Sequence, residues 1–243
     1  MLGLLKRLNQ SFLEVRSEDA FILRTLSRVD SSRQAQILEV GCGLGRLLRK
    51  VLAQGHRVRG VDANRSLIQA HQAKGLPCLQ LDDLDTEKGV PENSLDVLVI
   101  AHVIEHLAPN DLLGFLENYL KRLKPGGILI VATPLLTANF FDDFDHVKPY
   151  QPESLNLIFQ NTTENQFQFS FPVSMQLEDL WFRRIPYRLK FYRSNFLPQS
   201  FRWLFPVNFA LGFFYALSGG FIGQKDAWTG VYRKQHPATQ GKH

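Results

Sequence analysis

The stretch Glu39-Val40-Gly41-Cys42-Gly43-Leu44-Gly45 decides the fold of this chain. It follows a short apolar run, Gln36 to Val40, and precedes an amphipathic segment, Leu47 to Gln54. This order predicts a strand, a glycine loop and a helix, so that backbone amides lie at a helix N-terminus on the carboxyl edge of a sheet. A nucleotide-like ligand can approach such a loop closely because glycines carry no Cβ.

The glycine loop has an acidic partner in Asp62, which ends the next apolar run, Arg57 to Val61. A carboxylate at about this spacing binds ribose hydroxyls in nucleotide-binding folds. The glycines read G-x-G-x-G, with Arg46 where the dinucleotide fingerprint has its last glycine. This departure predicts an adenosine-type ligand without a pyrophosphate and disfavours a nicotinamide or flavin dinucleotide.

Short apolar runs alternate with helical segments from residue 36 to residue 133. Further strands are predicted at 78–81, 95–101 and 128–133, with helices after Asn64 and over 111–123. Continuous apolar strands separated by helices indicate a parallel sheet covered on both faces, which binds ligands at the carboxyl ends of its strands. Those ends carry polar residues: Asp62, Asp82, Asp83, His102 to His106, and Thr133.

With these motifs in this order, the chain resembles the class I S-adenosylmethionine-dependent methyltransferases, in the branch with a V-x-E-H-L element. The resemblance covers residues 36–160: Glu39–Gly45 is similar to the first motif, Val103–Leu107 to the fourth-strand element and Leu123–Gly127 to the L-K-P-G-G turn. It implies an α/β fold with a doubly wound, mostly parallel seven-stranded sheet of Rossmann-like type. It also implies an enzyme with S-adenosyl-L-methionine as its cofactor.

The resemblance further implies which residues bind this cofactor. Asp62 matches the acid that binds the ribose, Asp83 (less firmly Asp82) lies in the place near the adenine, and Glu39 braces the loop. The complete predicted set is Glu39, Gly41, Cys42, Gly43, Gly45, Asp62, Asp82 and Asp83.

Methyl transfer to a hydroxyl benefits from a base that removes the hydroxyl proton. The candidates are His102, Glu105, His106 and His146. We expect His146 and His102 on the acceptor side, because in similar proteins the segment after the fifth strand faces the acceptor. For His106, direct catalysis and support of the donor pocket both stay open.

The H-x-x-E-H pattern at 102–106 also matches an inverted zinc-peptidase motif, which we reject because Pro109 cuts the segment short. In similar quinone O-methyltransferases the matching element reads E-x-x-E-H and is implicated in magnesium binding. Here His102 replaces the first acid, which disfavours a hard, oxygen-preferring cation. We therefore expect no metal.

The chain changes character in the segment 177–224, predicted to be an insertion before the last strand. No acid occurs between Asp179 and Asp226, and 203–224 carries no charge. The uncharged run is interrupted at Pro206 and Gly219, which leaves a helix of about 18 Å against a hydrocarbon core of about 30 Å. We reject a membrane span, also because 227–233 alternates like the last strand of the same sheet.

Three interpretations of this insertion stay open. It forms a cap that buries its aromatic side chains over the acceptor pocket, a peripheral membrane contact through 181–224, or a surface for single-stranded RNA. The long apolar run argues against nucleic acid. We expect the acceptor to be an apolar or lipid-linked small molecule, such as a quinone precursor or a lipid-borne glycan. The alternatives are an RNA methyltransferase and a non-catalytic donor-binding partner protein.

The remaining expectations concern organisation and location. The chain has 243 residues, an excess of five basic residues and two cysteines, which suits a reducing cytoplasm. Residues 1–30 are predicted to form amphipathic helices and not a signal peptide. The methyltransferase domain is predicted to comprise 31–176 and 225–234, with a helix at 152–159 and a strand at 166–173. We expect a cytoplasmic protein, with membrane association left open.

Overall fold

A seven-stranded sheet organises the computed structural model, which describes residues 17–160, 171–191 and 198–236. Its spatial order is β3-β2-β1-β4-β5-β7-β6; β1 to β5 are parallel, and β7 is antiparallel to both β5 and β6. The predicted doubly wound, mostly parallel sheet is thereby confirmed. The strands are β1 (Gln36–Val40), β2 (Arg57–Asp62), β3 (Cys78–Gln80), β4 (Leu95–Ala101), β5 (Leu123–Pro134), β6 (Met175–Ile185) and β7 (Gln224–Lys234).

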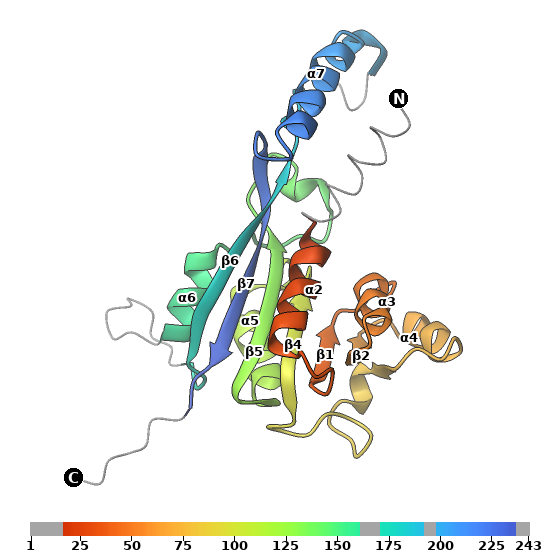
Figure 1. Cartoon of the computed structure of the whole chain (residues 1–243), viewed down its shortest axis with the longest axis vertical. Coiled ribbons are helices and arrows are strands. Elements are labelled where there is room, and N and C mark those ends of the chain that lie inside the picture. The colour runs from red at the N-terminus through yellow and green to blue at the C-terminus, as the bar shows by residue number, and fades with distance from the viewer. Residues whose placement is uncertain (1–16, 161–170, 192–197, 237–243) are drawn as a thin grey trace, which may run out of the picture.

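Helices cover both faces of the sheet (Figure 1). Side chains of α2, α3 and α4 share one buried cluster, and those of α5 and α6 share the other. The α-helices are α2 (Glu18–Val29), α3 (Arg46–Ala53), α4 (Arg65–Gln72), α5 (Pro109–Leu120), α6 (Pro152–Gln160) and α7 (Leu204–Leu217). Short 3-10 helices are η1 (Leu81–Asp83), η2 (Ile104–His106), η3 (Phe140–Asp142) and η5 (Pro198–Phe201). Asn64 caps α4 as predicted, its Oδ1 accepting a hydrogen bond from the Leu67 amide at 3.2 Å.

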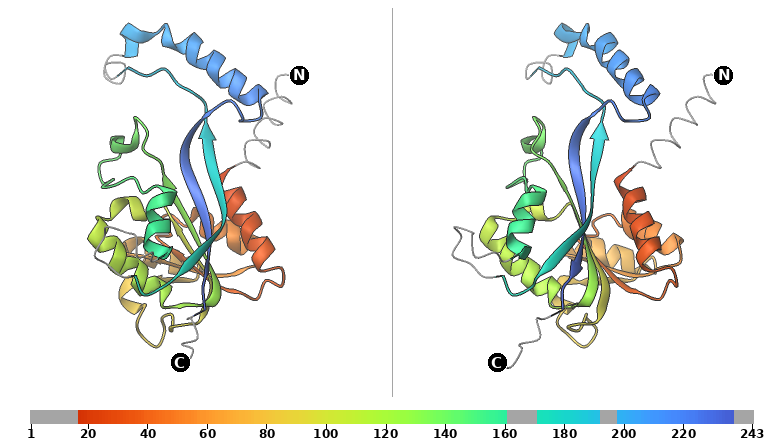
Figure 2. Two further views of the ribbon diagram at one scale, coloured as in Figure 1. Left: turned by 90° about the vertical axis from the view of Figure 1, so that its left-hand side faces the viewer. Right: turned by 60° about the vertical axis from the view of Figure 1, so that its left-hand side comes forward.

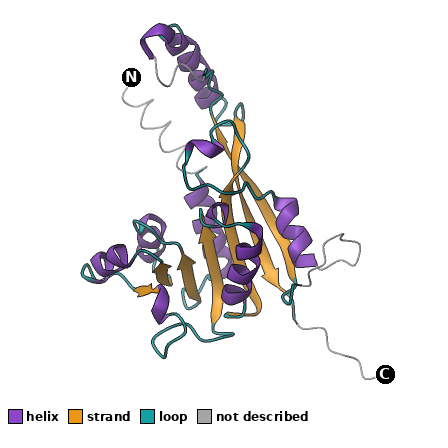
Figure 3. Cartoon of the chain, turned by 180° about the vertical axis from the view of Figure 1, so that it is seen from behind, coloured by secondary structure: helices purple, strands orange, loops and turns teal. Residues whose placement is uncertain are grey.

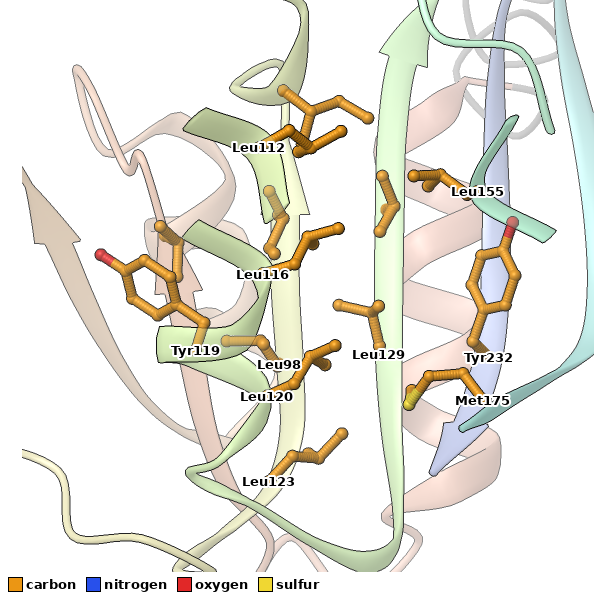
Figure 4. Close-up of a cluster of buried hydrophobic side chains, with 14 of the residues drawn as sticks. Leu98, Leu112, Leu116, Tyr119, Leu120, Leu123, Leu129, Leu155, Met175 and Tyr232 are labelled. Carbon is orange, nitrogen blue, oxygen red and sulfur yellow. The ribbon is translucent and has the colours of Figure 1, made fainter. Parts of the chain in front are cut away.

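The core on the α5 side explains why the sequences of β4 and β5 are continuous apolar runs (Figure 4). Leu112, Leu116 and Leu120 recur every four residues on α5 and are buried together with Leu98 of β4 and Leu129 of β5. The neighbouring residues of the same strands point to the other face and join the cluster under α2 and α3. Both faces of the central strands are therefore apolar.

The sixth strand lies later than predicted. Of the predicted strand 166–173, residues 166–170 lie outside the described part of the chain, and Phe171 to Val173 belong to no strand. The strand is Met175–Ile185, so that 177–185, predicted as the start of the insertion, belongs to the sheet. β6 is an edge strand whose side chains are mostly half-buried, which weakens the alternation that marks a strand in a sequence. In the predicted N-terminal region, 1–16 lies outside the described residues and 18–29 is helical.

The segment between β6 and β7 extends away from the body of the domain. In two further views the β6–β7 ribbon rises beyond the other strands and α7 lies at its far end (Figure 2). The view from behind shows the same arrangement (Figure 3). Within the described residues, α7 included, every helix is too short or too polar to cross a bilayer.

Candidate active site

The glycine loop lies where β1 ends, held against the neighbouring strand. The amides of Gly41 and Cys42 donate to the carbonyl of Val61 at 2.8 and 3.2 Å. Gly41, Gly43 and Gly45 all have positive φ, at 71°, 48° and 70°. A Cβ on Gly41 would overlap the Val103 side chain, whereas one on Gly43 would meet open space. Gly41 therefore allows β1 and the segment after β4 to pack closely, and Gly43 leaves room for a ligand.

Asp62 fixes this loop from the end of β2. Its Oδ2 accepts a hydrogen bond from the Gly43 amide and its Oδ1 one from the Asn64 amide, both at 2.8 Å. A carboxylate oxygen has more than one lone pair, so each can still accept from a ligand hydroxyl. The structure thus brings the predicted ribose-binding acid to the predicted loop.

A cavity of about 280 Å³ opens beside the loop. Its lining includes Glu39, Gly41 and Cys42 from the predicted set. It also includes Glu18 and Asp19, the first two residues of α2, which the sequence analysis missed. The acidic first turn of an amphipathic helix was visible there, but nothing local indicated that this turn would reach the glycine loop.

Glu39 is a buried carboxyl in the wall of this cavity. It is 5% exposed, and its Oε2 has no hydrogen-bond partner among the described residues. Burial raises the pKa of Glu39 to about 8, because little solvent stabilises its charge. A ligand ammonium group at Oε2 would supply both a hydrogen bond and the opposite charge.

His102 lies in the cavity wall with its ring between two acids. Nε2 is 2.7 Å from Oε1 of Glu18, and Nδ1 is 3.2 Å from Oε1 of Glu105. Burial opposes the charge of this ring, but the hydrogen bonds to Glu105 and Glu18 outweigh it and raise the pKa of His102 to about 9. His102 is therefore an imidazolium at neutral pH. Hydrogen bonds to Glu18 and Glu105 at both ring nitrogens argue against His102 as the base on the acceptor side.

Glu105 connects the donor pocket to the segment after β5. It is fully buried, and its Oε2 accepts from the Thr133 hydroxyl at 3.1 Å. Its backbone oxygen accepts from the amides of Val147 and Lys148 at 2.8 and 3.1 Å. Glu105 therefore holds His102 on one side and the chain next to His146 on the other.

His146 and His106 lie together at this edge, with ring centroids 5.0 Å apart. Nδ1 of His146 lies 2.7 Å from the Phe140 carbonyl, and Nδ1 of His106 lies 3.1 Å from the Asp145 carbonyl. A carbonyl oxygen only accepts, so in each neutral ring Nδ1 carries the proton and Nε2 the lone pair. Nε2 of His146 also lies 3.6 Å from Oδ2 of Asp143. The structure thus gives both histidines a basic nitrogen.

The same place has the residues that could hold a metal. Ligand atoms of Glu105, His106 and His146 lie within 4.8 Å of one another. The prediction of no metal considered only the H-x-x-E-H segment. It did not include His146, which lies in the loop after β5. Both carboxylate oxygens of Glu105 already accept hydrogen bonds, from His102 and Thr133.

The other predicted cofactor residues, Asp82, Asp83 and Cys42, have a less direct relation to the cofactor site. Asp83 is half-buried in η1, at the carboxyl edge beside β3, whereas Asp82 is exposed and pairs with Arg65. Cys42 is buried behind the loop, packed against Gly60, and burial raises the pKa of its thiol. A further residue was missed: Nε2 of the buried His71 lies 2.8 Å from the Gly43 carbonyl.

Comparisons with known proteins agree with this geometry. A family model described as "Methyltransferase domain" matches residues 38–129, which hold the glycine loop, Asp62 and the 102–106 segment. This chain contains a class I S-adenosylmethionine-dependent methyltransferase domain. S-adenosylmethionine is the cofactor of the methyltransferase domain, and the residues around the loop fit it. Gly43 leaves space, Asp62 has lone pairs for hydroxyls, and Oε2 of Glu39 has no hydrogen-bond partner among the described residues.

Curated relatives match the methyltransferase domain at low identity. The ubiquinone biosynthesis O-methyltransferase of Rickettsia prowazekii (strain Madrid E) is 30% identical over 139 residues, covering 54% of this chain and 50% of the relative. That of Bradyrhizobium sp. (strain ORS 278) is 33% identical over 101 residues, covering 40% and 39%. The chain thus spans half the length of the first relative and less of the second.

Solved structures share the fold. A SAM-dependent methyltransferase from Archaeoglobus fulgidus superposes with a TM-score of 0.56 at 22% identity, covering 91% of this chain and 96% of that one. The 1,6-didemethyltoxoflavin-N1-methyltransferase of Burkholderia thailandensis, solved with S-adenosylhomocysteine, gives a TM-score of 0.53 at 14% identity, covering 94% and 88%.

Proposed function

We propose that this protein methylates a hydroxyl group of an apolar or lipid-linked small molecule, with S-adenosylmethionine as donor. The observation that carries the proposal is the hydrogen bond between Nδ1 of His146 and the Phe140 carbonyl, 2.7 Å long. It orients a basic nitrogen in the segment that follows β5. The names of the curated relatives, ubiquinone biosynthesis O-methyltransferases, support an oxygen acceptor on an apolar molecule.

When bound, S-adenosylmethionine would supply a methyl group on a sulfonium sulfur: an oxygen nucleophile attacks the methyl carbon in line, the carbon–sulfur bond breaks, and S-adenosylhomocysteine leaves. The protein's part is first to hold donor and acceptor in this alignment, which is worth on the order of 7–11 kcal/mol. Nε2 of His146 then accepts the hydroxyl proton as the new carbon–oxygen bond forms. A base so placed contributes roughly 10²–10⁴-fold to the rate.

His106 and Glu105 position this base. The Glu105 carbonyl binds the amides of Val147 and Lys148, and the His106 ring packs against the His146 ring. The buried Trp228 adds a third attachment, its Nε1 donating to the Tyr150 carbonyl at 2.8 Å. The segment that carries His146 is thereby tied to η2 and to β7.

The test is transfer of label from methyl-tritiated S-adenosylmethionine into a cell extract, separated into organic, RNA, protein and small soluble fractions. We expect counts in the organic phase and none with Gly43→Asp, whose side chain enters the donor space. Counts in the RNA fraction would favour an RNA methyltransferase. No transfer into any fraction, with S-adenosylhomocysteine still bound, would indicate a non-catalytic donor-binding protein.

A second variant tests the base. We expect His146→Gln to lower kcat by about 10²-fold or more while its affinity for S-adenosylhomocysteine stays at the wild-type value. Lys148→Gln, two residues away and exposed, is the matched control and should retain activity. An active His146→Gln variant would remove the proposed role.

A further inference from the structure

The arm, defined here as residues 186–191 and 198–223, exposes an apolar helix face. On α7, Phe205, Phe209, Phe213 and Leu217 follow one another at intervals of four residues and are 75%, 68%, 57% and 72% exposed. Phe214, Phe221 and Ile222 are also more than half exposed. So large a continuous apolar surface marks a contact site and is unusual in a free protein.

The opposite side of α7 forms hydrogen bonds with β6 and the residues after it. Oδ1 of Asn208 accepts from the Leu189 amide at 2.7 Å, and Nδ2 donates to the Leu189 carbonyl at 3.0 Å. The Tyr215 hydroxyl donates to the Arg184 carbonyl at 2.7 Å. These contacts, with the buried Leu204, attach one side of α7 to the end of β6 and the chain after it and leave the phenylalanine face outward.

This exposure argues against one of the three interpretations of the segment. A cap over the acceptor pocket requires buried aromatic side chains, whereas those on the outer face of α7 are exposed. In all the overall views α7 lies at the end of the β6–β7 ribbon, away from the body of the domain (Figures 1, 2 and 3).

The charge of the arm indicates its partner. From Arg184 to Lys225 the chain has no acidic residue. Arg188, which follows β6, and Arg202, which precedes α7, are both exposed. Basic residues beside an exposed aromatic face fit a surface with anionic headgroups over an apolar layer. A second copy of the same face would bring like charges together.

The length of α7 determines how the arm would lie relative to a bilayer. α7 has 14 residues, or about 21 Å, against about 30 Å of hydrocarbon core. A helix of this length lies in the plane of the interface instead of crossing it.

We propose that the arm is a monotopic docking element for anionic lipid membranes. The arm leaves the sheet at the same edge as the donor site: Ala227 at the start of β7 pairs with Pro134 at the end of β5. Lys190 also contacts the loop before His146, with Nζ 2.7 Å from Oδ2 of Asp142 and 2.9 Å from Oδ1 of Asn139. Docking therefore turns the active-site edge toward the lipid. The proposal rests on residues outside the donor site and stands independently of the proposed function.

The first test is co-sedimentation of the full chain with vesicles of phosphatidylcholine containing phosphatidylglycerol. We expect the wild type to partition onto them at least about tenfold more strongly than the combined variant F205S/F209S/F213S/L217S. Leu157→Ser, which changes an apolar side chain on α6, is the matched control and should bind as the wild type does. Equal binding by the wild type and the combined variant would overturn the proposal.

The second test addresses charge. We expect the Arg188→Glu/Arg202→Glu variant to lose binding to the anionic vesicles, as should the wild type at high salt or with pure phosphatidylcholine. Arg57→Glu, an exposed change at the start of β2 on the opposite edge of the sheet, should have little effect. Unchanged vesicle binding by the double variant would contradict the proposal.

A third measurement does not depend on the multiple variants folding. Trp203 is 54% exposed, and its fluorescence should shift to shorter wavelength when anionic vesicles are added. Trp203→Phe should abolish this shift, since Trp228 is buried and Trp181 stacks on Phe21. An unshifted spectrum, or a dimer in solution that the phenylalanine variant dissociates without any vesicle binding, would overturn the proposal. Affinity for S-adenosylhomocysteine reports separately that each variant retains its donor site.

Discussion

The imidazole Nε2 of His102 lies 2.7 Å from Oε1 of Glu18, a residue 84 positions earlier in the chain. This contact closes the donor pocket between the start of α2 and the end of β4. His102 adopts φ of +57°, a left-handed conformation that costs free energy in residues other than glycine. The ion pairs to Glu18 and Glu105 stabilise the ring in the place to which this backbone directs it.

The charge of His102 predicts a pH dependence of stability. Its pKa in the folded protein, about 9, exceeds its ordinary value of 6.5, so its contribution is complete below about pH 6.5 and is lost as pH rises through about 9. His102→Asn, a residue that tolerates positive φ, should remove this contribution. The difference in melting temperature between wild type and variant should therefore shrink from pH 6 to pH 9.5. A difference that stays constant over this range would contradict a charged His102.

Glu39 gives a second prediction, in which stability is again lost as pH rises. Because burial raises the pKa of Glu39 from 4.5 to about 8, the stability that the neutral carboxyl contributes is complete below about pH 4.5 and is lost as pH rises to about 8. Glu39→Gln should thus be more stable than the wild type at pH 9 and close to it at pH 5. It should also bind S-adenosylhomocysteine at least about tenfold more weakly, because a neutral amide does not pair with the ligand ammonium. Calorimetry measures both, and wild-type affinity would exclude Glu39 from the donor site.

Asp62 should be required for donor binding. Asp62→Ala removes the acceptor of the Gly43 and Asn64 amides, and we expect affinity for S-adenosylhomocysteine to fall by at least about tenfold. Asp96→Ala is the matched control. Its carboxylate also accepts from a backbone amide, that of Gln36 at 2.8 Å, but at the amino edge of the sheet. Asp96→Ala should lower stability but leave the affinity for S-adenosylhomocysteine unchanged. Equal affinities of the two variants for this ligand would refute the assignment of Asp62.

Two glycines should respond differently to the same change. Gly41→Ala places a Cβ against Val103 at positive φ, so we expect it to destabilise the fold by more than about 2 kcal/mol. Gly43→Ala meets no neighbouring side chain and carries only the backbone cost, about 1–2 kcal/mol, but its methyl group enters the donor space. Urea unfolding should therefore rank Gly41→Ala as the less stable variant.

Val103→Ala provides the control for this pair. Combined with Gly41→Ala it should recover part of the lost stability, because it removes the atoms that the new Cβ overlaps. It should not restore donor affinity to Gly43→Ala. Additive effects of the Gly41 and Val103 changes would show that they do not interact.

Local sequence patterns correctly predicted those helices and strands that form through interactions among neighbouring residues. The run 95–101 forms β4 because its residues are apolar on both faces, and Asn64 starts α4 because its side chain accepts from an amide three residues on. β6 was misplaced because an edge strand with half-buried side chains lacks a clear alternation. The donor-site residues from α2 were missed because no local pattern says which turn of a helix meets a distant loop.

The sequence by itself determined the parallel sheet, the glycine loop and the edge at which the ligand binds, since periodicity and glycine chemistry act over a few neighbouring residues. Only the tertiary structure decided that the pKa of His102 is raised, because the acid at its Nε2 comes from α2. It also decided that Nδ1 of His146 meets the Phe140 carbonyl and that the outer face of α7 is exposed. Protonation and burial depend on groups that folding brings together from distant parts of the chain.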